Sequence, residues 1–266
     1  MHPSTTQTLA SDRLETSSSP GDWRSRKPLV NCACTSVEGK RVVRLPGRLM
    51  PRLFCGLTPA ELGSIMSAAS HRHLSRSAVI VQRDDAAERM FLLTKGQGKQ
   101  FVLTPDGRRI ILHWLTAGQF FGGVTLLAAP HPYLASTEVD SGSCLLAWDK
   151  KTIREFVSRF PILLDNALSI AVTEHIAWAI TARISLMSDD AKGRIANLLL
   201  SLACGIGIDC QDGVELRIGN EDLAAGANVT PFTISRILSE WQREGILKKG
   251  RGKLLLLRPE LLMDSK

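Results

Sequence analysis

The chain has 266 residues, a formal net charge of +7 and a pI near 9.3, so it is long enough for two domains and favours an acidic partner. Its six cysteines are too few and too scattered for a disulfide framework, which favours a reducing, cytoplasmic compartment. The sequence contains neither a signal-peptide core nor an apolar run of about 18 residues, so we expect a soluble protein without a membrane segment. It also lacks a phosphate-binding glycine loop, a nucleophile elbow and a His-Glu-x-x-His pair, so we expect no enzymatic activity.

The N-terminal segment, residues 1–45, is rich in Ser, Thr and charged residues and has no hydrophobic period. We predict that it is disordered and that order begins near Leu45. Shortly afterwards, Thr58, Pro59 and Glu61 have the spacing of a helix start with a capping box.

Short β-type runs separated by Gly and Asp extend from about Ser75 to Trp148. The Pro105-Asp106-Gly107 triplet lies between two alternating runs and predicts a hairpin. Strands this short and closely spaced favour a small barrel or jelly roll, which we place at residues 46–149. Such a barrel can enclose a ligand.

Residues 150–187 predict two helices, one from Lys150 to Phe160 and a second that begins at Pro161 and runs to about Met187. Apolar residues occupy nearly every side of the second helix: Leu164, Leu168, Ala171 and Trp178 on one side, Val172, Ile176, Ile180 and Ile184 on another. We therefore expect it to be buried against the barrel and against the same helix of a second subunit. The dimer face that we predict comprises Leu164, Leu168, Ala171, His175 and Trp178. The alternative is burial within a monomer.

The last segment, residues 188–266, has the element order of a winged helix-turn-helix. A capped helix (191–203) and a strand (216–218) precede a short helix that we expect to break at Gly226. Thr230 and Pro231 then begin a helix with one apolar stripe, and two β-type runs enclose a basic tip at residues 248–253.

The second helix of such a unit presents its first two turns to base edges, and the wing neutralises phosphates. Arg236 is suited to a bidentate pair with guanine. The candidate DNA contacts are Thr230, Phe232, Thr233, Ser235, Arg236 and Ser239 in the helix and Lys248, Lys249, Arg251 and Lys253 in the wing. The alternative is a small helical subdomain with a solvated basic face.

Three strings, at residues 118–122, 220–224 and 233–238, resemble the Crp/Fnr superfamily of bacterial transcription regulators, and the resemblance extends over about residues 46–260. It implies an α+β protein with an N-terminal jelly-roll β-barrel, a long dimerisation helix and a C-terminal winged helix-turn-helix. It also implies a homodimer on a pseudo-palindromic operator in double-stranded DNA, with half-sites about one helical turn apart, and contact with RNA polymerase.

The sequence departs from the cyclic-nucleotide-binding members of that family. They carry Glu after the glycine that matches Gly122, and an Arg-Ser or Arg-Thr pair about ten residues later; here Gly123 takes the Glu position, and no arginine lies between Arg109 and Arg154. A buried phosphodiester without a cation is costly, so we do not expect cyclic AMP to bind through the usual contacts. The candidate effector pocket comprises Phe120, Phe121, Gly122, Gly123, Val124, Leu126, Ser136 and Thr137.

The recognition helix departs as well. Pro231-Phe232 stands where many members carry Arg-Glu or Val-Glu, so the glutamate that contacts cytosine is missing and a standard operator is not expected. Phe232 is suited instead to contact a thymine methyl group.

The sequence does not identify the effector. Cys32, Cys34, Cys55 and Cys144 are candidate iron–sulfur ligands, although the Cys-x-Cys spacing departs from the family pattern. His113, His131 and His175 are candidate haem ligands, although none of them matches a known ligand position of the family. We assign no metal and favour a small organic effector or none. An alternative from another functional class is a regulatory subunit of the cyclic-nucleotide-binding type that uses the barrel alone. It would give the helix-turn-helix no function.

Overall fold

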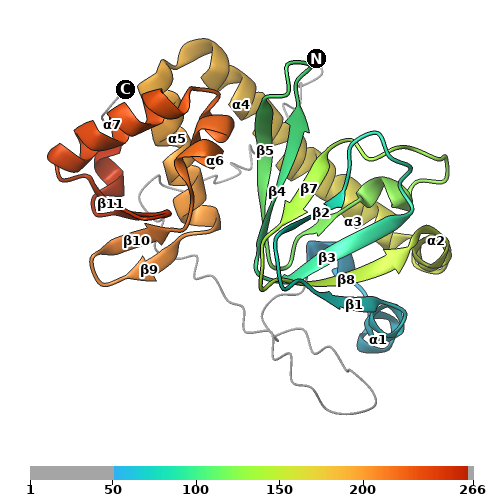
Figure 1. The fold of residues 1–266 in the computed structure, drawn as a ribbon. Helices are drawn as coiled ribbons and strands as arrows, with labels where there is room; N and C mark the ends of the chain where they lie inside the picture. The colour runs from blue at the N-terminus through green and yellow to red at the C-terminus, as the bar shows by residue number, and fades with distance from the viewer. Residues whose placement is uncertain (1–50, 263–266) are drawn as a thin grey trace, which may run out of the picture.

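A computed structural model describes residues 51–262, apart from the side chains of Glu174, Ala177, Trp178 and Ser188 (Figure 1). The predicted disordered segment, which includes Cys32 and Cys34, lies outside the described residues. No single helix in the described part is long and apolar enough to cross a membrane; only the pair Lys150–Arg159 and Ile162–Thr173 passes that test together, and it is bent by 109°.

The first elements are η2 (Arg52–Phe54) and α1 (Pro59–Ser67). The predicted capping box is confirmed: the Glu61 backbone N–H donates to Thr58 Oγ1 at 3.3 Å, and the Thr58 backbone N–H donates to Glu61 Oε2 at 2.8 Å. These two bonds satisfy donors that a helix start otherwise leaves open.

Eight strands form two antiparallel four-stranded sheets, β1-β8-β3-β6 and β2-β7-β4-β5, which confirm the jelly-roll prediction. The strands are β1 (Ser70–His73), β2 (Ala78–Val81), β3 (Arg89–Lys95), β4 (Gln97–Leu103), β5 (Arg109–Thr116), β6 (Phe120–Phe121), β7 (Ser136–Val139) and β8 (Cys144–Asp149), with η3 (Gly123–Leu126) after β6. The predicted hairpin joins β4 to β5. Our prediction missed β1 and β7, because their Ser-His-Arg-His and Ser-Thr-Glu-Val sequences lack an apolar run.

The helices that follow the barrel are α2 (Lys150–Arg159), α3 (Ile162–Ile170) and α4 (Ala177–Ser188). The predicted helix from Pro161 to about Met187 is continuous, from Ile162 to Ser188, but it contains an unpredicted π-helical segment, η4 (Ala171–Ile176), between α3 and α4. At its start the Thr173 hydroxyl donates to the Ser169 carbonyl at 2.8 Å, a bond of the kind that perturbs the regular ladder. The apolar sides of this helix are also not all covered by the chain itself: Leu168, Val172, Ile176, Ile180 and Ile184 are 50–63% exposed.

The C-terminal unit contains α5 (Ala191–Gly205), β9 (Ile208–Cys210), β10 (Gly213–Leu216), α6 (Asn220–Ala227), α7 (Pro231–Arg243), β11 (Leu247–Gly250), β12 (Lys253–Leu256) and η5 (Pro259–Leu262). The wing is confirmed, and its strands belong to a four-stranded sheet, β11-β12-β10-β9. The predicted strand 216–218 ends at Leu216 instead, because Val214 and Leu216 alternate into the core and pair with β12.

Two features of the helix-turn-helix differ from the prediction. Gly226 lies inside α6, and the left-handed turn residue is Asn228, at φ 51°. Figure 1 shows α4 running from the barrel to the C-terminal unit, with α6 facing the β4–β5 side of the barrel. The two units therefore contact each other directly as well as through α4.

Candidate nucleic-acid interface and effector cavity

Helix α7 is fixed in the C-terminal core by its apolar stripe. Ile234, Ile237, Leu238 and Trp241 are at most 2% exposed. At its start, Thr230 Oγ1 accepts the Thr233 backbone N–H at 3.1 Å, and Pro231 occupies the first turn, as predicted. Burial on one side leaves the opposite side of α7 at the surface.

The surface side of α7 carries most of the predicted base contacts. Phe232 is 78% exposed. Ser235 and Arg236 are exposed, and within residues 51–262 Arg236 makes no hydrogen bond or ion pair. The hydroxyls of Thr230 and Thr233 lie 2.9 Å apart and bond to each other. Phe232, Ser235 and Arg236 are thus the side chains most available to a groove.

The wing is tied to α7. Lys249 Nζ donates to Ser239 Oγ at 2.8 Å, and the Lys249 backbone N–H donates to Gln242 Oε1 at 3.3 Å. The first of these bonds joins Lys249, a predicted phosphate contact, to Ser239, a predicted base contact. Lys248 and Arg251 are exposed on the same hairpin.

Two ion pairs reduce the charge that this surface offers. Lys253 Nζ lies 2.9 Å from Glu215 Oε2, and hydrogen bonds from Arg217 and Lys253 hold the pKa of Glu215 below its usual value. Glu240 pairs with Lys192 at 2.6 Å, a bond that lowers the pKa of Glu240. Lys248 and Arg251 are therefore better placed than Lys253 to neutralise phosphates.

A cavity of about 660 Å³ lies between the barrel and helix α3–η4–α4. Its lining is Val81, Gln100, Leu112, His113, Phe120, Phe121, Gly122, Gly123, Val124, Leu126, Leu127, Tyr133, Leu134, Ala135, Thr137, Leu164, Ala167, Leu168, Ile170, Ala171, His175 and Ala179. None of these described lining residues is Lys, Arg, Asp or Glu. The volume lies in the range of small-molecule sites.

The cavity includes most of the predicted pocket. Phe121, Gly122, Gly123, Val124 and Thr137 line it. Ser136 does not: it is buried elsewhere, and its hydroxyl accepts the Arg83 backbone N–H at 3.0 Å, because neighbouring residues in a strand point to opposite faces.

Sequence reasoning missed the contributions of β4 and β5 to this cavity, Gln100, Leu112 and His113, as pocket residues. Alternation along these strands could have assigned their inward positions, but the face that meets the cavity depends on how the two sheets pack. Leu164, Leu168, Ala171 and His175, predicted as dimer contacts, also line the cavity.

The cysteine and histidine candidates are dispersed. Cys144 is fully buried, with its Sγ 3.4 Å from His73 Nδ1, whereas Cys55 is exposed. Between residues 51 and 262, no group of three or more His, Cys, Asp or Glu could hold a metal ion. His113 and His175 both line the cavity, with ring centroids 5.8 Å apart and edge-on, whereas His131 is exposed. The described residues alone therefore do not form an iron–sulfur site.

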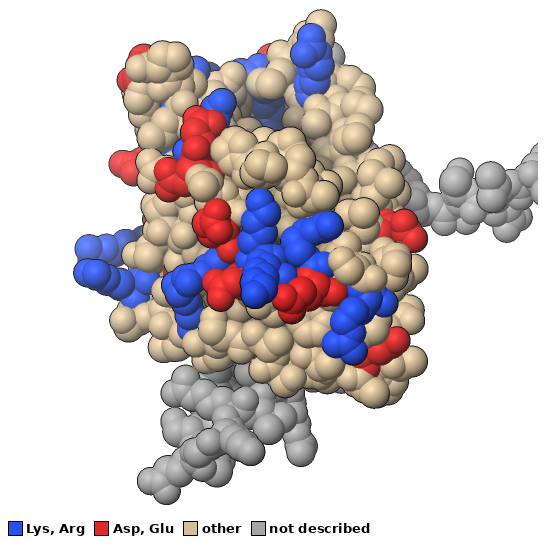
Figure 2. All heavy atoms as spheres, turned by 90° about the vertical axis from the view of Figure 1, so that its right-hand side faces the viewer, with Lys and Arg blue, Asp and Glu red and all other residues tan. Residues whose placement is uncertain are grey.

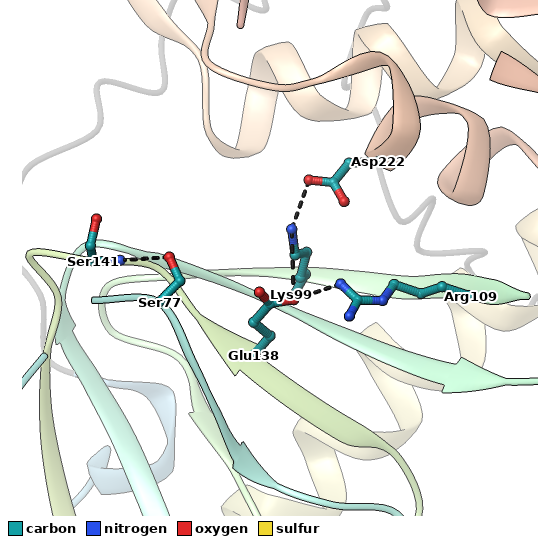
Figure 3. Close-up of polar contacts among 6 residues, drawn as sticks. All are labelled: Ser77, Lys99, Arg109, Glu138, Ser141 and Asp222. Carbon is teal, nitrogen blue, oxygen red and sulfur yellow. Dashed lines mark hydrogen bonds and ion pairs between the residues drawn. The ribbon is translucent and has the colours of Figure 1, made fainter. Parts of the chain in front are cut away.

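The contact between barrel and helix-turn-helix is centred on Lys99 (Figure 3). Lys99 Nζ lies 2.7 Å from Asp222 Oδ2 of α6 and 3.9 Å from Glu138 Oε2 of β7, and Glu138 accepts from Arg109 at 2.6 Å. Burial raises the pKa of the nearby Asp140 carboxyl, and the positive charge of Lys99 acts in the opposite direction. One ammonium group thus bridges carboxylates of the two units.

An apolar contact lies beside this ion pair. A β-carbon at Gly226 would lie 2.5 Å from Trp114 Cη2 and 3.0 Å from Leu198 Cδ2. Glycine in a helix interior costs about 1 kcal/mol relative to alanine, and here it permits the close approach of the Trp114 ring. Trp114 packs against the core of the C-terminal unit although it belongs to β5.

The barrel face turned away from the helix-turn-helix is different in character. Figure 2 shows basic and acidic side chains next to one another on that face. Among the ion pairs of the barrel, Arg89 and Asp149 lie 2.8 Å apart at 45% and 68% side-chain exposure. A mixed surface of this kind does not form the one-sign stripe that nucleic acid favours.

Comparison with known proteins agrees with the two-unit architecture. Residues 71–160 match the cyclic nucleotide-binding domain family, and residues 193–265 match the Crp-like helix-turn-helix domain family. The chain is 26% identical over 213 residues to the cyclic AMP receptor protein of Thermus thermophilus, covering 80% of this chain and 95% of that protein. It is 26% identical over 208 residues to the nitrogen fixation regulation protein FixK of Bradyrhizobium diazoefficiens, and that match covers 76% of this chain and 84% of FixK.

Solved structures share the fold. FixK2 from Bradyrhizobium japonicum superposes with a TM-score of 0.64 at 19% identity, covering 74% of this chain and 97% of that one. The two family matches follow one another along the chain in the same order as the barrel and the winged helix-turn-helix of the structure. The chain belongs to the Crp/Fnr superfamily of transcription regulators, with a cyclic nucleotide-binding domain followed by a Crp-like helix-turn-helix domain.

Proposed function

We propose that this regulator is a homodimer that binds a pseudo-palindromic operator in double-stranded DNA through α7 and the wing. The observation that carries the proposal is the surface of α7, where Phe232, Ser235 and Arg236 project from a helix whose other side is buried. Arg236 pairs with a guanine, and Phe232 contacts a thymine methyl group. Lys248 and Arg251 neutralise flanking phosphates.

The exposed apolar stripe of η4 and α4 supports the dimer, and it differs from the face predicted from the sequence, four residues of which line the cavity. Val172, Ile176, Ile180 and Ile184 recur every four residues and are each at least half exposed, a pattern that marks an interaction surface. A second copy presents the same stripe, so a two-fold helix pair buries both. The dimer sets the spacing of the two α7 helices at about one helical turn of DNA.

The barrel supplies regulation, through an effector other than cyclic AMP. A phosphodiester in this cavity would lack a cationic partner among the described lining residues, and that desolvation is costly. Binding at promoters would then bring the regulator to RNA polymerase, the further partner that family membership implies.

Selection of duplexes from a random pool tests the DNA assignment. We expect an inverted repeat with half-site centres about 10 base pairs apart. Arg236→Ala should reduce discrimination at one base pair by about 1–3 kcal/mol. Arg251→Ala, the matched control, should weaken all duplexes equally and lower the salt slope by about one. Arg251 is a better control than Lys249, which bonds to Ser239. A pool without enrichment, or a uniform loss for Arg236→Ala, would contradict the proposal.

Sedimentation tests the dimer separately. Ile180→Glu places a charge in the stripe and should yield monomers. Ile208→Glu, at an exposed isoleucine in β9, should leave the dimer intact. Equal behaviour of the two variants would place the interface elsewhere.

A further inference from the structure

Three polar residues of the cavity form one cross-strand row. Gln100 of β4 pairs in register with His113 of β5 on one side and with Thr137 of β7 on the other. All three line the cavity. Residues opposite one another on adjacent antiparallel strands have β-carbons about 5 Å apart, so the row presents neighbouring polar groups to one ligand.

The Thr137 hydroxyl in this row lacks a partner. Thr137 is fully buried, and its Oγ1 makes no hydrogen bond with any described residue. Val139, two residues along the strand, belongs to the barrel core, so alternation places Thr137 on the same inner face. An unpartnered buried hydroxyl costs about 1–3 kcal/mol, which a ligand group can recover.

The other polar atoms of the cavity are engaged differently. The Tyr133 hydroxyl accepts the Arg89 backbone N–H at 3.0 Å and donates to the Arg89 carbonyl at 2.8 Å, so its only proton is used within the barrel. The remaining lining is largely aliphatic and aromatic, from Leu112, Phe121, Leu134 and others. The other polar side chains that line the cavity are those of the row and His175, and within the row His113 Nε2 also lies 3.4 Å from Gln119 Nε2.

We propose that the cavity binds an uncharged, largely apolar small molecule, and that its one polar end, a hydroxyl or carbonyl, hydrogen-bonds to the row formed by His113, Gln100 and Thr137. This inference rests on the proposed function, since it names the effector class of the same barrel. Apolar burial supplies the affinity, and the row selects the orientation. Because the described lining has no Lys or Arg, an anionic ligand would be buried without a cation of fixed charge.

The test uses three probes with one ring system: 1-naphthol, 1-methylnaphthalene and 1-naphthoate, which differ only by a hydroxyl, a methyl or a carboxylate. Each competes with the fluorescence of N-phenyl-1-naphthylamine bound to the purified full-length protein. We expect 1-naphthol to bind about threefold to tenfold more tightly than 1-methylnaphthalene, the range of one hydrogen bond. We expect 1-naphthoate to bind most weakly, and cyclic AMP not to compete.

Variants locate the effect. Thr137→Val keeps the side-chain shape and should reduce the preference for 1-naphthol to about twofold or less. Thr94→Val is the matched control, because Thr94 is also a buried strand threonine but donates to the Cys144 carbonyl at 3.1 Å and lies outside the cavity lining. Leu134→Arg adds a cation to the lining and should raise the affinity for 1-naphthoate.

Three results would overturn the inference: no saturable probe binding, equal affinity for 1-naphthol and 1-methylnaphthalene in the unmodified protein, or tightest binding of 1-naphthoate or cyclic AMP. A preference for 1-naphthol that survives Thr137→Val would exclude the row. None of these readouts requires DNA. Failure here with intact operator selection therefore removes the effector class alone, and failure of operator selection leaves the probe result standing.

Discussion

The two faces of the sheet formed by β4, β5 and β7 have opposite chemistry, although their residues are immediate neighbours in the chain. The inner row, His113–Gln100–Thr137, meets a cavity without a described charged side chain. The outer row, Trp114–Lys99–Glu138, is one residue away on each strand and contacts the helix-turn-helix through a charge and an indole ring. A single layer of backbone thus separates the cavity from the helix-turn-helix unit.

The two rows are mechanically linked through the strands that carry both. A ligand that shifts one strand of the sheet moves a cavity residue and an interface residue together, because adjacent residues share a peptide plane. Closely packed contacts have discrete arrangements rather than continuous ones, so a small shift can change the docking of α6. Perturbing each face separately tests how far the two behave as one unit.

The largest expected effect is at the apolar outer contact. Gly226→Leu places a side chain where the β-carbon alone would lie 2.5 Å from Trp114, and overpacking of this kind costs about 1–3 kcal/mol. We expect a lower free energy of unfolding in urea and faster hydrogen exchange in β4. Gly63→Leu is the control, since beyond its chain neighbours and the backbone of its own helix no atom lies within 4 Å of a β-carbon there. A similar loss of unfolding free energy in both variants would show that the effect of Gly226→Leu does not come from its contact with Trp114.

A smaller effect is expected at the charged outer contact. The Lys99–Asp222 pair is partly buried, at 14% and 28% side-chain exposure, so we expect Lys99→Met to cost about 1–2 kcal/mol. A double-mutant cycle with Asp222→Asn should give a coupling energy of about 1 kcal/mol. The Arg89–Asp149 pair is the control: at 45% and 68% exposure its coupling should be under about 0.5 kcal/mol. Equal coupling in the two cycles would argue against a special role for Lys99.

The smallest effect has the opposite sign and belongs to the inner face. Thr137→Val removes an unpartnered hydroxyl, so we expect the free energy of unfolding to rise by about 0.5–1 kcal/mol. Thr94→Val removes a hydroxyl that donates a hydrogen bond to the Cys144 carbonyl, so it should lower the free energy of unfolding by about 1 kcal/mol. Urea denaturation without ligand measures both. Destabilisation by Thr137→Val would mean that its hydroxyl already has a partner.

Local chemistry explains which predictions succeeded. The Thr58–Glu61 capping box, the hairpin between β4 and β5, and the stripe of α7 depend on residues a few positions apart, so the sequence contains all the participants. Strand β7 and segment η4 were missed. A short polar strand is stabilised by neighbours distant in the sequence, and a π-helical segment differs from an α-helix by one extra residue in a turn.

The order of the elements, the buried and exposed sides of α7, and the absence of arginine between Arg109 and Arg154 could all be read from the sequence, because each depends on residue type at short spacing. Only the tertiary structure decided that Gly226 accommodates Trp114 rather than ending a helix, and that Lys99 reaches Asp222 over 123 residues of chain. It also set Thr137 in the cavity and Ser136 outside it. Those outcomes depend on which faces of packed elements meet, and periodicity within one element carries no such information.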